Sequence, residues 1–169
     1  MNTPTPRATR ESLLQLSLHT EVVIHASPER IWRTLTDFAS YREWNKSIPQ
    51  AAGEARAGAW LDVVIQWPGL KSSPYRLEVL DARPNAELRW LGRFGRPGLM
   101  DGDHRFLLEP LKDGKTRVIQ AERFSGWLVP FFAPWLKKNV LEGFEGMNTA
   151  LKQRAEGRAD GEIAHAETL

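Results

Sequence analysis

The sequence of 169 residues contains no cysteine. Disulfide bonds, thiolate nucleophiles and zinc–thiolate sites are therefore excluded. The sequence also lacks an apolar run long enough for a transmembrane helix, and its N-terminus lacks the apolar core of a signal peptide. We therefore expect a cytoplasmic protein.

An excess of charge of either sign is also missing. The 23 basic and 21 acidic residues give a net charge of +2, which is too small to indicate a nucleic-acid partner. The four histidines are scattered along the chain, and the sequence holds neither a HExxH motif nor a Walker loop. We expect no metal site and no cofactor, and enzymatic activity remains an open question at this stage.

Tryptophan, by contrast, is abundant, with seven residues in a chain of otherwise ordinary globular composition. Most of these side chains are expected in the core or at its edge, but several could line a ligand cavity. The length favours a single domain. We expect a disordered arm over residues 1–13, the domain over residues 14–157 and a polar tail over residues 158–169.

Two helix starts follow one another in "SPERIWRTLTDFASYREWN", residues 27–45. Ser27 followed by Pro28 is a typical helix start. Ser40 with Glu43 reads as a capping box, which predicts a second, very short helix. Because a continuous helix would not be capped again halfway, we expect the chain to bend near Asp37.

The rest of the chain alternates as strands do and then ends in one helix. Period-two runs predict antiparallel strands, with a further short strand near residues 48–54. An apolar stripe from Phe132 to Leu151 in steps of three and four residues predicts the closing helix. The predicted strands are residues 14–25, 59–67, 75–82, 86–92, 103–109 and 115–124, and the predicted helix is residues 131–155.

This order of elements predicts an α+β fold in which a curved antiparallel sheet wraps around the long C-terminal helix. One helix covers a strongly curved sheet along its axis but does not fill the whole concave side. We expect the two short helices to close one end, and Trp32 and Trp44 to fill the gaps beside them.

Three stretches resemble proteins of the SRPBCC superfamily, which are START-like and related to polyketide cyclases and dehydrases. They are "TEVVIHASPERIWRTLTDFASYREWN", "GDHRFLLEPLKDGKTRVIQAERFSG" and "ALKQRAEG", and together they extend over residues 19–157. The resemblance implies the helix-grip fold, in agreement with the predicted element order. It also implies a cavity between sheet and helix for a lipid, sterol or aromatic polyketide; some members of the superfamily are enzymes and many are not.

One polar pair stands out on the last two predicted strands. If residues 111–115 form the loop between them, His104 lies opposite or diagonal to Glu122, and both point to the concave side. Three interpretations stay open: a carboxylate that shapes the rim, a pair that binds a ligand's polar end, and an acid–base pair. The expected ligand-binding residues are Trp90, His104, Phe106, Val118, Glu122, Val140, Phe144 and Met147.

The segment "FSGWLVPFFAPW" holds more large apolar side chains than one helical turn can bury. Packing across the sheet edge, a portal, a membrane-touching lip and a dimer contact are all compatible with it. We expect Trp127, Phe131 and Phe132 to form a portal, and either to stay partly exposed in a monomer or to be covered only by a second copy of the chain. Membrane contact is conceivable without direct support, and the protein is expected to be a monomer or a homodimer.

Three functions therefore remain. The first is a binder or carrier of a hydrophobic small molecule. The second is a cyclase- or dehydratase-like enzyme that uses the same cavity. The third is a partner-binding module of the co-chaperone kind, because activators of a heat-shock ATPase share this fold class. The aromatic cavity favours the first two.

Overall fold

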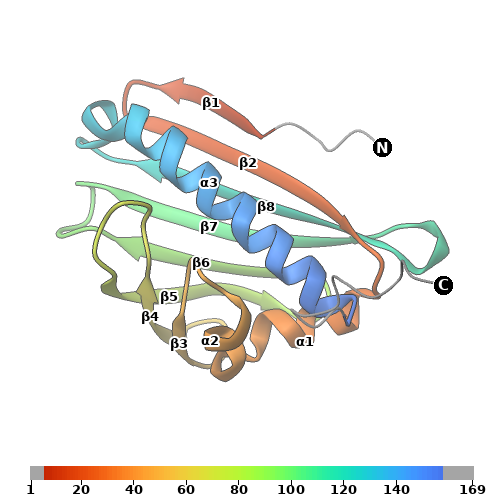
Figure 1. Ribbon diagram of the computed structural model, residues 1–169. Coiled ribbons are helices and arrows are strands. Elements are labelled where there is room, and N and C mark those ends of the chain that lie inside the picture. Colours follow the sequence, from red (N-terminus) through yellow and green to blue (C-terminus); the bar gives the residue numbers. More distant parts are fainter. Residues whose placement is uncertain (1–5, 158–169) are drawn as a thin grey trace, which may run out of the picture.

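The computed structural model describes residues 6–157 and shows the predicted helix-grip architecture (Figure 1). A sheet of eight antiparallel strands has the order β1-β2-β8-β7-β6-β5-β4-β3. It curves around the long helix α3 (Val129–Ala155), which crosses the concave face. The strands are β1 (Arg7–Ser12), β2 (Gln15–Ile24), β3 (Gln50–Gly53), β4 (Trp60–Ile65), β5 (Ser73–Arg83), β6 (Glu87–Arg93), β7 (Asp101–Pro110) and β8 (Thr116–Ser125).

The prediction of a disordered arm over residues 1–13 is wrong for residues 7–12. Residues 7–12 form β1, which pairs with β2 at the edge of the sheet, with Arg7 opposite His19. All six residues of β1 are exposed, so the apolar alternation used to find the other strands is missing from this one. Backbone hydrogen bonds to β2 and the polar contacts of Glu11 with Ser17 and Arg123 hold it in place. The predicted polar tail, residues 158–169, lies outside the described residues.

The two helix starts produce the predicted bend. Helix α1 (Pro28–Thr36) begins at Ser27, whose side chain accepts a hydrogen bond from the Arg30 N–H. It ends at Asp37, whose ψ of 71° is not helical. The short helices η1 (Phe38–Ser40) and α2 (Tyr41–Trp44) follow.

The predicted capping box does not form. Ser40 caps no backbone N–H; its hydroxyl donates to the carbonyl oxygen of Asp37 and accepts from the indole of Trp44 at 3.3 Å. The backbone of Ser40 is already helical, because η1 runs directly into α2, and a side-chain cap needs an extended residue at that position.

The short helices fill one end of the sheet, as predicted. Phe38, Tyr41 and Trp44 are buried and pack edge to face, while Trp32 is partly buried against the same core. The Tyr41 hydroxyl donates to the carbonyl oxygen of Leu35 at 2.7 Å, and burial raises the pKa of Tyr41 well above its ordinary value. A large apolar core joins these helices to the C-terminal part of α3.

Helix α3 begins two residues before the predicted start and packs chiefly against β2. Its N-terminal half shares a second core with β2 and β8, built on Leu16, Leu18, Phe124, Val129, Ala133, Leu136, Val140 and Phe144. Thr20, which interrupts the apolar alternation of β2, is also buried under the helix. Its hydroxyl accepts a hydrogen bond from the Asn148 side-chain N–H at 2.9 Å.

We predict that Thr20→Val destabilises the fold by about 1–3 kcal/mol, because the buried Asn148 amide loses its partner. Thr20→Val combined with Asn148→Leu should restore much of that loss, since no polar group is then left unpaired. Urea denaturation of the three proteins measures both effects. A double variant that is less stable than Thr20→Val by another loss of about 1–3 kcal/mol would contradict this account.

Candidate functional site

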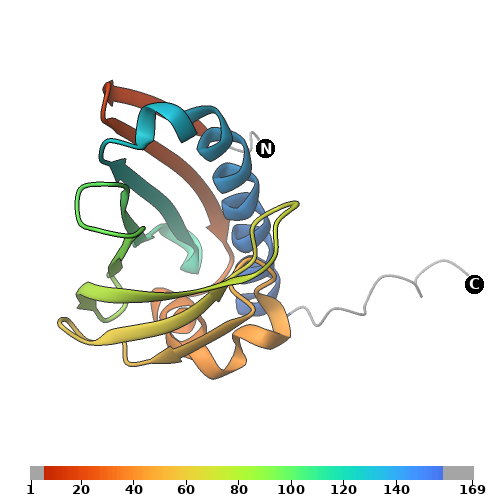
Figure 2. The ribbon, with the colours of Figure 1, turned by 90° about the vertical axis from the view of Figure 1, so that its left-hand side faces the viewer.

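A cavity of about 600 Å³ lies between the concave face of the sheet and α3. This volume falls within the range of about 300–1,000 Å³ that is typical of small-molecule sites. The lining is mostly apolar and aromatic, and it comes from β4 to β8, from α3 and from the segments 47–48, 66–70 and 93–100. The exposed lining residues Leu70, Phe94 and Phe132 mark the mouth of the cavity, and their segments border the side of the molecule that faces the viewer in Figure 2.

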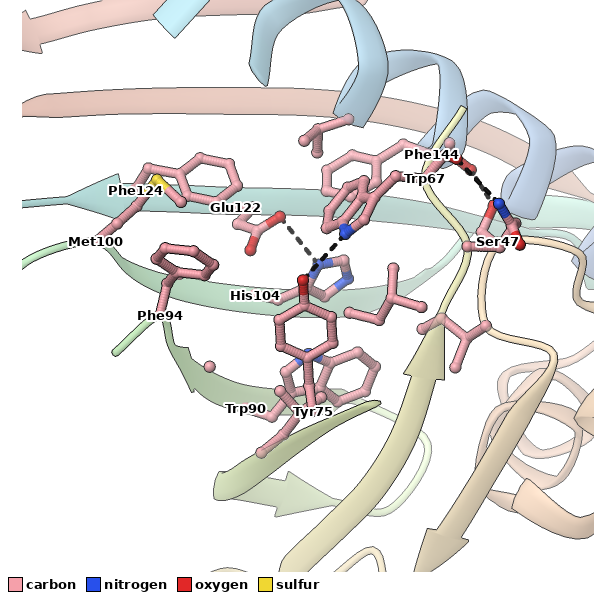
Figure 3. A pocket seen from close by; sticks show the side chains of 18 of the residues that line it. Ser47, Trp67, Tyr75, Trp90, Phe94, Met100, His104, Glu122, Phe124 and Phe144 are labelled. Atoms are coloured by element: carbon pink, nitrogen blue, oxygen red, sulfur yellow. Dashed lines mark hydrogen bonds and ion pairs between the residues drawn. The ribbon is translucent and has the colours of Figure 1, made fainter. Parts of the chain in front are cut away.

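His104 and Glu122 occupy the floor of this cavity, as the strand parity predicts (Figure 3). The two residues are direct partners across β7 and β8. The His104 Nδ1 atom lies 3.7 Å from a carboxylate oxygen of Glu122, and the two side chains are only 7% and 13% exposed. The predicted location on one concave face is therefore confirmed.

The position of the Glu122 carboxylate depends on a glycine. Gly102 on β7 lies diagonal to Glu122, and a Cβ atom there would lie 2.5 Å from a carboxylate oxygen of Glu122. Any side chain at position 102 would therefore displace the carboxylate from the place it now occupies beside His104.

Aromatic rings hold the imidazole of His104 in place. Trp90 stacks on it with a centroid distance of 4.8 Å and an interplanar angle of 7°, while Phe144 of α3 meets it edge to face at 5.0 Å. These contacts leave little freedom to the ring. His104 is thus fixed on a rigid strand with one edge directed to Glu122.

Gln120 is the polar residue of this floor that our sequence reasoning missed. Its side-chain nitrogen lies 3.4 Å from His104 Nε2 and 3.7 Å from the sulfur of Met147. Its oxygen Oε1 is buried and has no hydrogen-bond partner among the described residues. Residue 120 lies on the same face of β8 as Val118 and Glu122, so the alternation of this strand already indicated that Gln120 lies on the concave side.

Two acceptors of the floor therefore lack a donor that satisfies them fully. They are the Glu122 carboxylate and the Gln120 oxygen. The one other charged lining residue, Arg93, forms an ion pair with Glu78 at 3.2 Å. Since buried acceptors are stabilised by hydrogen bonds, the floor suits a molecule that donates them.

The predicted lining residues divide into two groups. Trp90, His104, Glu122, Val140, Phe144 and Met147 line the cavity. Phe106 and Val118 do not, and this part of the prediction is wrong: both are fully buried in the apolar core beside the cavity. They lie on the concave side, but farther along their strands, where the short helices and the end of α3 already fill the space.

Several lining residues were not predicted because they lie on loops or on the other half of the sheet. The loop after β4 carries Trp67, which packs on Trp135 of α3 at 5.4 Å. The Trp67 indole also donates to the Tyr75 hydroxyl at 3.3 Å (Figure 3). Ser47 donates to the carbonyl oxygen of Gly143 at 3.0 Å, so the segment before β3 also holds α3. These positions follow no helix or strand periodicity, so the sequence pattern did not indicate that they come together.

The predicted exposure of Trp127, Phe131 and Phe132 is confirmed, at 71%, 80% and 42% of their surface. Of the three, Phe132 lines the cavity. Trp127 and Phe131 are not among the residues that line it, so a portal role for them remains a prediction.

The segment 94–100, between β6 and β7, is fastened to the start of α3. The N–H groups of Trp127 and Leu128 donate to the carbonyl oxygens of Gly98 and Leu99, at 3.1 and 2.9 Å. Between them and β8 lies Gly126, with a φ of +132°, where a Cβ atom would overlap the carbonyl group of Leu99. One side of the cavity mouth is therefore a single hydrogen-bonded rim.

Among the described residues there is no group of three or more histidine or acidic side chains that could hold a metal ion. None of the described helices is long and apolar enough to cross a membrane.

A family model described as "Polyketide cyclase / dehydrase and lipid transport" matches residues 15–156. No curated protein matches the sequence significantly.

Solved structures share the fold at low sequence identity. A START superfamily protein from Mycobacterium smegmatis is 24% identical, with a TM-score of 0.69 over 85% of this chain and 99% of that one. The Zhui aromatase/cyclase from Streptomyces sp. R1128 is 16% identical, with a TM-score of 0.67 over 88% and 99%. The di-domain aromatase/cyclase StfQ of steffimycin biosynthesis is 12% identical, with a TM-score of 0.70 over 86% of this chain and 52% of that one.

We predict that Gly126→Ala destabilises the protein by about 1–3 kcal/mol or more, because alanine is strained at this φ and also overlaps Leu99. Gly98→Ala is the matched control: its φ is also positive, at +84°, but a Cβ atom there meets nothing within 4 Å. It should lose only about 1 kcal/mol. If urea denaturation shows equal losses of stability for the two variants, the close contact of Gly126 with Leu99 contributes nothing to stability.

Proposed function

The chain belongs to the family of polyketide cyclase/dehydrase and lipid transport proteins, and on this premise we propose that it binds a ring-containing hydrophobic molecule that carries a hydroxyl group. The rings occupy the aromatic cavity under α3. The hydroxyl donates to the Glu122 carboxylate, which is partly exposed in the cavity. The observation that carries this proposal is the acceptor-rich floor of an otherwise apolar cavity.

Apolar contact alone is a weak source of affinity here. A ligand that buries on the order of 300 Å² of apolar surface gains roughly 7 kcal/mol at about 25 cal/mol per Å². The loss of translational and rotational freedom takes back at least about 4 kcal/mol. A hydrogen bond to a charged group adds about 1.5–3 kcal/mol, so the polar floor decides which apolar molecules bind usefully.

The same floor disfavours acids. A ligand carboxylate placed there would lie beside the Glu122 carboxylate, and like charges at short range repel strongly in an apolar cavity. The one lining cation, Arg93, is paired with Glu78. Free fatty acids are therefore poor ligands in this orientation, whereas phenols and alcohols fit.

We predict that 1-hydroxypyrene binds at least about tenfold more tightly than pyrene-1-carboxylate at neutral pH, which corresponds to about 1.4 kcal/mol. Fluorescence titration of the two probes measures the preference. Glu122→Gln should reduce it, because the amide does not repel the acid and accepts a weaker hydrogen bond. The control is Glu109→Gln, an exposed position on β7 that is paired with Arg117, which should leave the preference unchanged. Equal affinities for the two probes in the wild-type protein would contradict the proposed role of the floor.

Position 143 tests whether the ligand lies under α3. Gly143 lines the cavity, and a Cβ atom there would approach only the Ser47 hydroxyl, at 3.8 Å. We predict that Gly143→Leu fills the cavity and removes the binding of the neutral dye Nile red. Gly146→Leu is the matched control, since Gly146 is an exposed glycine of the same helix with open space around it. Dye binding that survives only in the control supports the proposal, and equal binding in both folded variants contradicts it.

An enzyme of the cyclase or dehydratase kind is the second candidate. The close His104–Glu122 pair inside the cavity favours it, because such a pair can move a proton to or from a bound ligand. Turnover of a bound ligand that is lost in Glu122→Gln while its binding persists would support the enzyme over the carrier.

A further inference from the structure

The large apolar side chains that are exposed gather at the end of the molecule where the cavity opens. They lie in the turn between β1 and β2, in the loops after β4 and β6, and at the start of α3. The set comprises Leu13, Leu70, Phe94, Leu99, Trp127, Phe131 and Phe132, and we call it the apolar rim. Among the described residues only Trp60 and Leu80 are comparable elsewhere.

Three of the four segments that carry the apolar rim are joined to one another. Backbone hydrogen bonds join the segment 94–100 to Trp127 and Leu128. A further one, from the Gly126 N–H to the carbonyl oxygen of Leu14 at 3.0 Å, joins the β1–β2 turn to the same point. The three segments therefore lie side by side at the end of the molecule that faces the viewer in Figure 2.

A cavity ligand does not account for the most exposed members. Trp127 and Phe131 are 71% and 80% exposed and do not line the cavity. On α3, Phe131 projects opposite to the side that buries Ala133, Leu136 and Val140. Exposed aromatic side chains in such a group are typical of a surface that contacts something else.

Three of the four segments of the apolar rim carry charges of one sign only. Segments 66–72, 93–100 and 126–138 contain no aspartate or glutamate, and their charged residues are Lys71, Arg93, Arg96, Lys137 and Lys138. Apart from Arg93, none of these forms an ion pair with a residue that the structure describes. The acidic residue next in sequence, Asp101, accepts a hydrogen bond from the Gly98 N–H.

We propose that the apolar rim and its basic residues dock on an anionic lipid bilayer, with the cavity mouth against the membrane. Aromatic side chains flanked by lysine and arginine match the interface between acyl chains and anionic headgroups. A second copy of the chain fits less well, because a two-fold interface through the apolar rim would bring unpaired cations together. The proposal depends on this surface alone and is independent of Glu122 and of the ligand that the cavity takes.

Co-sedimentation with lipid vesicles tests the docking. The wild-type protein should bind vesicles of phosphatidylcholine with phosphatidylglycerol, bind pure phosphatidylcholine much more weakly, and lose binding as salt is added. Absence of binding to the anionic vesicles at low salt would overturn the proposal.

Two pairs of double variants separate the apolar and basic contributions. Trp127→Ser with Phe131→Ser should weaken binding by tenfold or more, and Lys137→Gln with Lys138→Gln by about 25-fold, at about fivefold for each cation. The controls are Trp60→Ser with Leu80→Ser on β4 and β5, and Lys112→Gln with Lys115→Gln in the turn between β7 and β8 at the far end (Figure 1). Rim and control variants that bind alike would contradict the docking surface.

Light scattering after size-exclusion chromatography tests whether a second copy of the chain, instead of a membrane, covers the apolar rim. A monomer that binds vesicles through the apolar rim agrees with the proposal. A dimer that the Trp127→Ser/Phe131→Ser variant dissociates, and that binds no vesicles, would assign the apolar rim to self-association and overturn it. Thermal unfolding of each variant should match the wild type, since the substituted side chains are exposed, so weakened binding does not reflect unfolding.

Discussion

The structure depends on one geometric constraint, which is that a single helix covers a sheet of eight curved strands. Helix α3 lies along β2, and its two halves belong to different apolar cores. Toward its C-terminal end the short helices after β2 fill the remaining space with Phe38, Tyr41 and Trp44. Toward its N-terminal end nothing comparable is present among the described residues, and the unfilled concave space there is the cavity.

Polar groups follow the line along which the helix meets the sheet. Asn148 and Thr20 are paired deep under α3, and Gln120, His104 and Glu122 continue the line into the cavity. Groups of this kind are tolerated in an interior when they find hydrogen-bond partners. The Asn148 side-chain N–H finds one in Thr20, whereas the side-chain oxygens of Asn148 and Gln120 have none among the described residues. The polar groups of the cavity therefore lie where the packing of α3 against the sheet ends.

The cavity and the apolar rim are consequences of the same incomplete coverage. Where α3 begins, its apolar residues outnumber the positions available on β2 and β8, so Ala133 and Leu136 are buried while Phe131 is exposed. The hydrogen bonds from Trp127 and Leu128 to the loop after β6 hold these exposed apolar residues at the mouth of the cavity. A binding cavity and an exposed apolar surface thus arise side by side from one mismatch between helix and sheet.

Local patterns in the sequence determined the elements, their order and the faces that they bury. Period-two alternation placed His104 and Glu122 on one concave face, and the cap at Ser27 placed the first helix start. Patterns of this kind depend only on neighbours along the chain, so one sequence is enough to read them. β1 escaped this reasoning because an exposed edge strand has no apolar alternation. The depth of Phe106 and Val118, the approach of Trp67 and Tyr75, and the unpaired oxygen of Gln120 were decided by the tertiary structure. Each depends on how far along the sheet α3 and the loops lie, and that position results from packing between segments distant in sequence.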